Sequence, residues 1–127
     1  MMYNSTLLRH LRDMSRAVFL DVADNYSWVV AHGVILPFGY NWATTQILFL
    51  IPWDYPTTPP GLTTQDGIYL PRGLRYFGRV IRDYHEHITW GNNWCWFCYK
   101  RIRWNPYRDD LITILEMVRT DLQNPRY

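Results

Sequence analysis

The sequence has no long hydrophobic run. No segment approaches the roughly 20 apolar residues of a membrane-spanning helix, and the polar start, residues 1–16, has no apolar core of signal-peptide length. We therefore expect a cytoplasmic protein with no membrane partner. The chain has 127 residues, 48% of them hydrophobic, and a net charge of +2. These values predict one globular domain over residues 1–127.

Cysteine is scarce, with only Cys95 and Cys98. Two cysteines in a chain expected in a reducing compartment are typical of thiols or metal ligands and not of a disulfide framework. Both lie in the aromatic run 94–99, Trp-Cys-Trp-Phe-Cys-Tyr. Their role is therefore either chemical or one of packing.

Lysine is rarer still, because Lys100 is the only one among 13 basic residues. A lysine amine is a nucleophile that acyl-transfer chemistry consumes, whereas arginine binds carboxylates and phosphates through a planar fork. A protein that handles activated acyl groups would thus offer few amines of its own for modification. A general compositional bias would give the same numbers.

The hydrophobic pattern changes between helical and strand-like segments. Residues 4–6 offer capping side chains, and the apolar residues after them recur at helical spacing, so we expect a helix near the N-terminus. Strand-like runs follow, separated by turn residues, at 17–22, 27–36 and 44–51. A closing helix is expected with Asp109 as its N-cap. This order predicts an α+β fold with an antiparallel meander sheet.

The middle of the chain is rich in proline and glycine. Residues 52–73 are therefore expected to be largely irregular, and loops of this length are usually functional. Arginines then recur at three- and four-residue steps, at positions 72, 75, 79 and 82. This spacing fits either a short helix, which Gly73 and Gly78 disfavour, or an extended arginine-lined segment.

Two ordered motifs resemble the ubiquitin-conjugating enzyme (E2) superfamily. Residues 55–60, Tyr-Pro-Thr-Thr-Pro-Pro, match its Tyr-Pro-x-x-Pro-Pro turn, and residues 104–106, Trp-Asn-Pro, match its Trp-Ser-Pro turn except at one position. Together with Leu-Pro-Phe-Gly-Tyr-Asn at 36–41, Pro-Trp-Asp at 52–54 and Trp94, they are most similar to a bacterial noncanonical branch, prokaryotic family E. The resemblance covers about residues 17–123, which we take as the core of the domain.

The resemblance implies an N-terminal helix, a meander sheet, a long active-site loop and a closing helix. It implies that the protein accepts a ubiquitin-like modifier from an activating enzyme as a cysteine thioester and passes it to an amine. Members of this branch are typically encoded beside these partners and a JAB-type metallopeptidase, in conjugation systems that include antiphage defence. The alternative is a noncatalytic adaptor that docks the activating enzyme or the modifier.

The resemblance also implies candidate site residues. The spacing from Cys95 to Trp104 fits the family better than that from Cys98, so Cys95 is the expected nucleophile and Cys98 the alternative. The family's His-Pro-Asn triplet is absent, and Asn92 or Asn93 could supply the missing oxyanion donor. The base for the incoming amine could be His87, His85 or Glu86. By position alone, Arg9, Arg12 and Arg16 on the first helix would meet the activating enzyme.

Plainer interpretations of these residues remain open. A cysteine flanked by aromatic residues is ordinarily a small buried hydrophobe. Asn92 and Asn93 follow Gly91 and fit a simple turn, and the three residues 85–87 fit a solvated strand or turn. By comparison with the usual family pattern, we do not expect the two further C-terminal helices in residues 1–127.

Two other classes of site compete with the thioester. His85, His87, Cys95 and Cys98 supply four zinc-type ligands, although their spacing is not that of a usual zinc finger; no other metal or cofactor is expected. The arginines of residues 72–103, interleaved with aromatic residues, could bind a single-stranded nucleic acid or an acidic protein. The net charge of +2 is too small to require nucleic acid.

Overall fold

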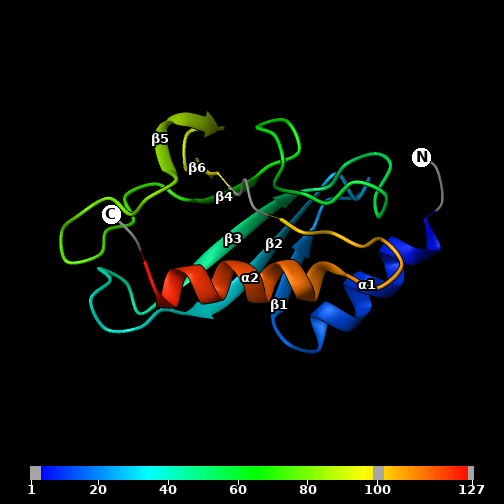
Figure 1. The fold of residues 1–127 in the computed structure, drawn as a ribbon, viewed down its shortest axis with the longest axis horizontal. Coiled ribbons are helices and arrows are strands. Elements are labelled where there is room, and N and C mark those ends of the chain that lie inside the picture. The colour runs from blue at the N-terminus through cyan, green and yellow to red at the C-terminus, as the bar shows by residue number, and fades with distance from the viewer. Residues whose placement is uncertain (1–3, 99–101, 126–127) are drawn as a thin grey trace.

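The computed structural model of the protein describes residues 4–98 and 102–125 and contains one antiparallel sheet with two helices on one of its faces (Figure 1). The elements are α1 (Ser5–Ser15), β1 (Phe19–Val22), β2 (Trp28–Ile35), β3 (Thr44–Leu50), β4 (Ile68–Pro71), β5 (Tyr84–Trp90), β6 (Trp94–Phe97) and α2 (Leu111–Gln123). The strand order is β1-β2-β3-β4-β6-β5. The α+β fold with an antiparallel sheet is confirmed.

The three strands expected from the sequence are present as β1, β2 and β3, but the sheet has three more. β4 lies within the stretch 52–73 that was expected to be irregular, and the cysteine run forms strand β6 and not an active-site loop. The sequence did not predict these strands because β4 and β6 have four residues each and β5 has no clear alternation. Residues 72–82 form neither of the two expected elements, only turns and isolated bridges.

Both helices have N-caps that the local sequence explains. The side chain of Asn4 accepts a hydrogen bond from the Leu7 N–H at 2.9 Å, as the capping residues predicted. α2 is capped by Asp110, which forms a capping box with Thr113, so the predicted cap at Asp109 was wrong by one residue. Asp109 instead accepts a hydrogen bond from the Asn105 N–H at 2.8 Å, inside the turn before the helix.

The two faces of the sheet have separate apolar clusters. The larger cluster joins α1 and α2 to alternate residues of β2 and β3, such as Val29, Ala31, Ile47 and Phe49. The other face has a small cluster built on Val30, Leu48, Leu50 and Tyr69, with partly buried tryptophans packed against it. Within the described ranges, neither helix is long and apolar enough to cross a membrane.

Hydrogen bonds connect the Tyr-Pro-x-x-Pro-Pro loop to the N-terminal helix and to the Trp-Asn-Pro turn. Tyr55 is buried, its hydroxyl lies 2.6 Å from Nδ1 of His10 on α1, and its carbonyl accepts a hydrogen bond from the Asn4 side chain at 2.6 Å. The Trp104 indole N–H donates to the Pro56 carbonyl, also at 2.6 Å. The two motifs that carry the family resemblance therefore meet in space and fix the loop against α1.

Candidate functional site

Cys95 lies on β6, the strand next to the edge of the sheet, with its side chain in the main core. β6 pairs with β4 on one side and β5 on the other, and Cys95 is opposite Leu70 and Thr89. Its exposed fraction is 0%, and it belongs to the same apolar cluster as the two helices. In the folded protein, no surface of this thiol is open to a second protein.

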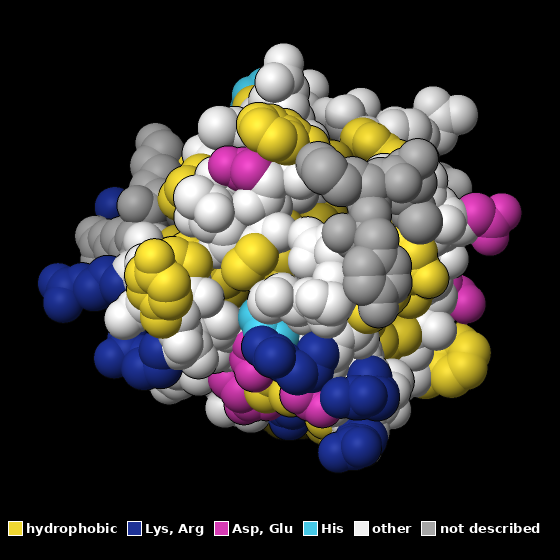
Figure 2. All heavy atoms as spheres, turned by 90° about the vertical axis from the view of Figure 1, so that its right-hand side faces the viewer, with side chains coloured by type: hydrophobic (Ala, Val, Ile, Leu, Met, Phe, Trp, Pro, Cys, Tyr) yellow, Lys and Arg dark blue, Asp and Glu magenta, His cyan; other side chains and the backbone are white. Residues whose placement is uncertain are grey.

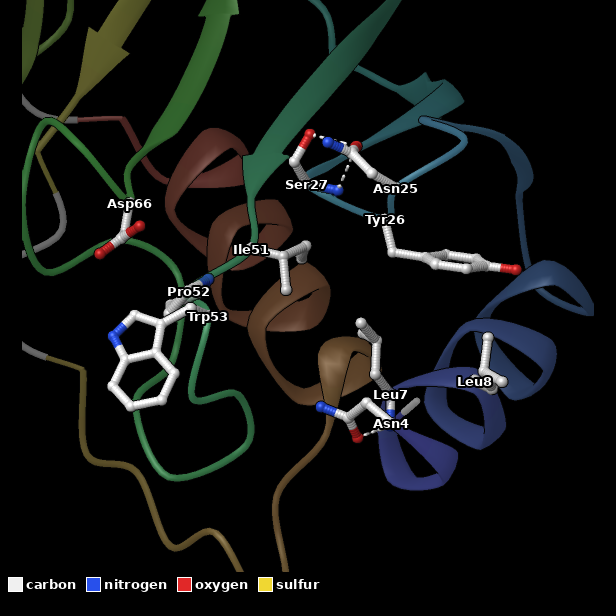
Figure 3. Close-up of a pocket in the computed structure, with 10 residues that line it drawn as sticks. All are labelled: Asn4, Leu7, Leu8, Asn25, Tyr26, Ser27, Ile51, Pro52, Trp53 and Asp66. Carbon is white, nitrogen blue, oxygen red and sulfur yellow. Dashed lines mark hydrogen bonds between the residues drawn. The ribbon is translucent and has the colours of Figure 1, made fainter. Parts of the chain in front are cut away.

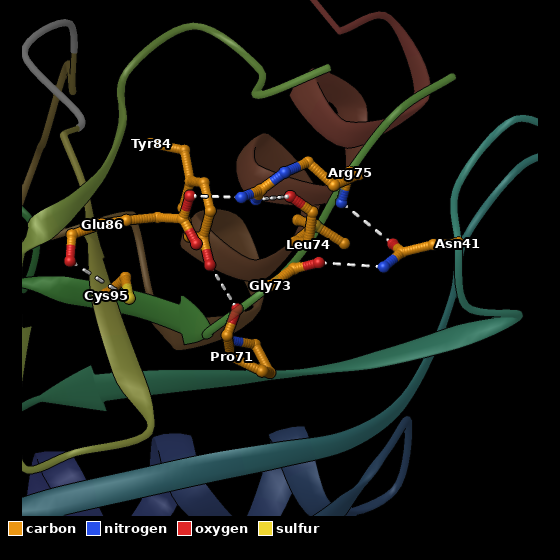
Figure 4. Close-up of polar contacts among 8 residues, drawn as sticks. All are labelled: Asn41, Pro71, Gly73, Leu74, Arg75, Tyr84, Glu86 and Cys95. Atoms are coloured by element: carbon orange, nitrogen blue, oxygen red, sulfur yellow. Dashed lines mark hydrogen bonds and ion pairs between the residues drawn. The ribbon is translucent and has the colours of Figure 1, made fainter. Parts of the chain in front are cut away.

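The surroundings of Cys95 are shown in Figure 4. Its Sγ lies 3.9 Å from the backbone carbonyl of Glu86, a weak contact. The Tyr84 hydroxyl donates to the Pro71 carbonyl; burial raises the pKa of Tyr84, and the neighbouring thiol adds to this shift. Arg75 does not serve the thiol, because its guanidinium donates to Glu86 at 2.6 Å and to the Leu74 carbonyl at 2.8 Å.

Cys98 follows directly after β6 and is also buried, with an exposed fraction of 3%. Its backbone N–H donates to the Asp83 carbonyl at 2.8 Å. Of the basic residues that follow Cys98 in the sequence, Lys100 and Arg101 lie outside the described residues, and Arg103 is exposed. Cys98 therefore lies nearer to the end of the strand than Cys95 but is equally covered.

Asn92 and Asn93 lie in the exposed turn between β5 and β6. Their backbone carbonyls accept hydrogen bonds from Nε and the backbone N–H of Arg72, at 2.9 and 2.8 Å. Among the described residues, no hydrogen bond joins either side-chain amide to Cys95. The structure thus gives both residues a role in the turn, while their role as oxyanion donors stays a prediction.

His87 and His85 lie on the outer strand β5. Their rings are 5.7 Å apart, and His85 stacks on Trp96, which is opposite it on β6. Because successive residues of a strand point to opposite faces, Trp96 and Cys95 face opposite sides of the sheet. The four zinc-type ligands do not converge, and no group of three or more potential metal ligands occurs in the described part of the chain.

A pocket of about 430 Å³ opens beside α1 (Figure 3). It is formed by the start of α1, the turn between β1 and β2, and the end of β3, with Leu7, Tyr26, Ile51 and Trp53 among its apolar walls. Figure 2 views this end of the molecule and shows exposed hydrophobic groups across it, with arginine side chains on its left side and along its lower edge, where acidic side chains lie among them. The volume lies in the range of ligand-binding pockets.

The sequence did not predict the buried contact between His10 on α1 and Tyr55. The His10 ring meets Tyr55 edge to face, and burial lowers the pKa of His10. Burial also raises the pKa of Tyr55, and the charge of Asp110 adds to that shift. Only the helical spacing of His10 with Leu7 and Met14 could have indicated that this histidine faces inward.

A family model described as prokaryotic E2 family E matches residues 8–125, nearly the whole chain. No curated protein and no solved structure matches this chain. The matched range includes both motifs, all six strands and α2.

Proposed function

Because the chain belongs to prokaryotic E2 family E, we propose that it is an E2-like docking protein of a cytoplasmic ubiquitin-like conjugation pathway. It binds the activating enzyme or the ubiquitin-like modifier and does not carry the modifier on a cysteine. The observation that carries this proposal is the burial of both thiols, Cys95 at 0% and Cys98 at 3% exposure.

The burial matters because thioester formation needs direct contact between Sγ and the carbonyl carbon of another protein's C-terminus. Access to Cys95 would require β6 to separate from β4 or β5. Each buried backbone group left without a partner costs roughly 1–3 kcal/mol. A strand hydrogen-bonded on both sides is therefore a poor place for a nucleophile that must meet a large substrate.

Docking, by contrast, uses features that the fold leaves at the surface. Arg9, Arg12 and Arg16 on α1 are all exposed, and the pocket beside α1 has a largely apolar wall. Exposed arginines next to an apolar pocket suit a protein partner with acidic groups around an apolar anchor.

A second candidate is the thioester carrier, with Cys95 or Cys98 as nucleophile, Asn92 or Asn93 as oxyanion donor and His87 as base. One observation favours it: Cys98 directly follows β6, just before the segment that leads to the Trp-Asn-Pro turn, which is the chain order of the E2 superfamily. This mechanism would need the end of β6 to open before the modifier arrives.

One experiment separates the two candidates. The protein is mixed with ATP and with an activating enzyme and a ubiquitin-like protein from the same genome. We expect complex formation with one of these proteins by calorimetry, equal for the wild type and the Cys95→Ser/Cys98→Ser double variant, and no reductant-sensitive adduct on this chain. The modifier thioester on the activating enzyme itself is the positive control. An adduct that disappears in Cys95→Ser or Cys98→Ser would establish the carrier instead, and the absence of any complex would refute docking.

A further inference from the structure

Two loops meet at the end of the sheet opposite the pocket beside α1. One loop follows β2 and contains Phe38; the other follows β4 and contains Phe77. We propose that this Phe38–Phe77 tip, the two phenyl rings and the loops that hold them, is a docking surface for an acidic protein segment with an apolar anchor side chain.

Backbone hydrogen bonds hold the two loops as one unit. The Phe77 N–H donates to the Gly39 carbonyl at 2.8 Å, and the Asn41 N–H donates to the Arg75 carbonyl at 3.1 Å. The Asn41 side chain adds two more, to the carbonyl of Gly73 and from the N–H of Arg75, both at 2.9 Å (Figure 4). A surface fixed in this way loses little conformational entropy when a partner binds.

The turn that presents Phe77 is unusual for an aromatic residue. Tyr76 and Arg79 exchange backbone hydrogen bonds at 2.9 and 3.0 Å, so Phe77 and Gly78 are the central residues of a tight turn. Both have positive φ, 48° and 76°, as in a type I′ turn, whose first central position favours asparagine, aspartate or glycine. A phenylalanine here strains the backbone, and the turn holds its side chain at the surface in spite of that strain.

The rings themselves remain open to solvent. Phe38 is 91% exposed and Phe77 58% exposed, and their centroids are 5.8 Å apart with the planes at 72°. A Cβ at Gly39 would lie 2.5 Å from ring atoms of Tyr76 and Phe77, so a glycine is needed for the rings to sit this close to the backbone. Paired exposed aromatic rings on a rigid support are typical of the anchor points of protein interfaces.

The charge of the two loops selects the partner. The two loops, residues 36–43 and 72–83, contain four arginines and one acidic residue, Asp83. Arg75 pairs with Glu86 of the adjoining strand at 2.6 Å, and the Arg72 and Arg82 side chains are exposed. An acidic segment therefore complements the loops. A nucleic acid suits them less well, because the edge-to-face rings offer no stacked platform for successive bases.

The test uses a short fluorescein-labelled peptide rich in glutamate with a central Leu-Phe pair, titrated against the full chain by fluorescence anisotropy. Phe77→Asn and Phe38→Ala should each weaken binding about tenfold or more, and replacement of the glutamates by glutamine should do the same. Tyr107→Ala is the control and should bind as the wild type does. Tyr107 is exposed and precedes the start of α2, whereas the loop that contains Phe38 contacts the other end of that helix, where the Tyr40 hydroxyl donates to the Leu122 carbonyl.

The two substitutions are chosen so that neither should unfold the protein. Asparagine suits the first central position of the turn, so Phe77→Asn should melt no lower than the wild type. The Phe38 side chain is almost fully exposed, so its removal cannot unfold the core. Unchanged peptide affinity in both variants, or no binding up to about 1 mM peptide, would overturn the proposal. Two other results would also overturn it. One is that the wild type binds a thymidine oligonucleotide more tightly than the peptide and the same variants abolish that binding; the other is that the wild type is a dimer and the same variants are monomers.

Discussion

Thiol chemistry depends on what surrounds each sulfur. A reactive cysteine needs partial exposure and a nearby positive charge or helix N-terminus. Cys95 has a core of apolar side chains on its face of the sheet, and the guanidinium of Arg75 is engaged with Glu86. At the scale of single residues, these surroundings are those of a packing cysteine, which supports the docking proposal.

The corresponding prediction concerns accessibility. In the native protein, Cys95 and Cys98 should react with DTNB at least about tenfold more slowly than in denaturant, because each 1.4 kcal/mol needed to open the structure lowers the reactive population tenfold. The rate is measured by absorbance, and single serine variants assign it to one thiol. A native thiol that reacts at the denatured rate would restore the carrier as the leading candidate.

Among the elements, α2 shows how a helix start is fixed by one side chain. Asp110 accepts a hydrogen bond from the Thr113 N–H at 2.9 Å, which satisfies a donor that the helix itself cannot pair. Asp109, one residue earlier, serves the preceding turn instead. The two aspartates therefore have different structural roles despite their adjacent positions.

Asp110→Ala should lower the free energy of unfolding by about 1 kcal/mol, the usual effect of losing an N-cap. The measurement is urea denaturation followed by circular dichroism. The control is Glu116→Ala on the exposed side of α2, where the ion pair with Arg119 at 3.1 Å should contribute no more than about 0.5 kcal/mol. Equal effects of the two substitutions would argue against the cap.

For the whole molecule, the contact between His10 and Tyr55 connects α1 to the loop that carries the family motif. Burial lowers the pKa of His10, although the carboxylates of Asp110 and Asp13 act in the opposite direction and Arg9 acts with burial. The folded protein therefore resists protonation at a position where the unfolded chain accepts a proton near pH 6.5.

The sign of the resulting pH dependence follows from this difference. As the pH falls from about 7 to about 5, the unfolded chain binds a proton that folded His10 does not, so the free energy of unfolding should decrease, by at most about 1.4 kcal/mol per pH unit. His10→Gln should flatten this dependence over the same interval, measured by urea denaturation at several pH values. A variant with the wild-type slope would assign the effect to the other histidines.

The sequence by itself determined the local features. The capping residues before α1, the first three strands, the apolar face of α2 and the two family motifs all depend on neighbours within a few residues, and each was predicted. The location of β4, β5 and β6 was not: β4 and β6 have only four residues each and pair with each other across about 25 residues of sequence, and β5 has no clear alternation. The same is true of the contact between His10 and Tyr55, which are 45 positions apart.

Only the tertiary structure decided which side of β6 faces the core. In the run Trp-Cys-Trp-Phe, either alternate pair could have been buried, and a shift of one residue in register exchanges the two faces. Pairing with β4 and β5 places Cys95 and Phe97 in the main core and leaves Trp94 and Trp96 on the other face. Because burial arises from this long-range pairing, the accessibility of the thiols could not be predicted from the sequence.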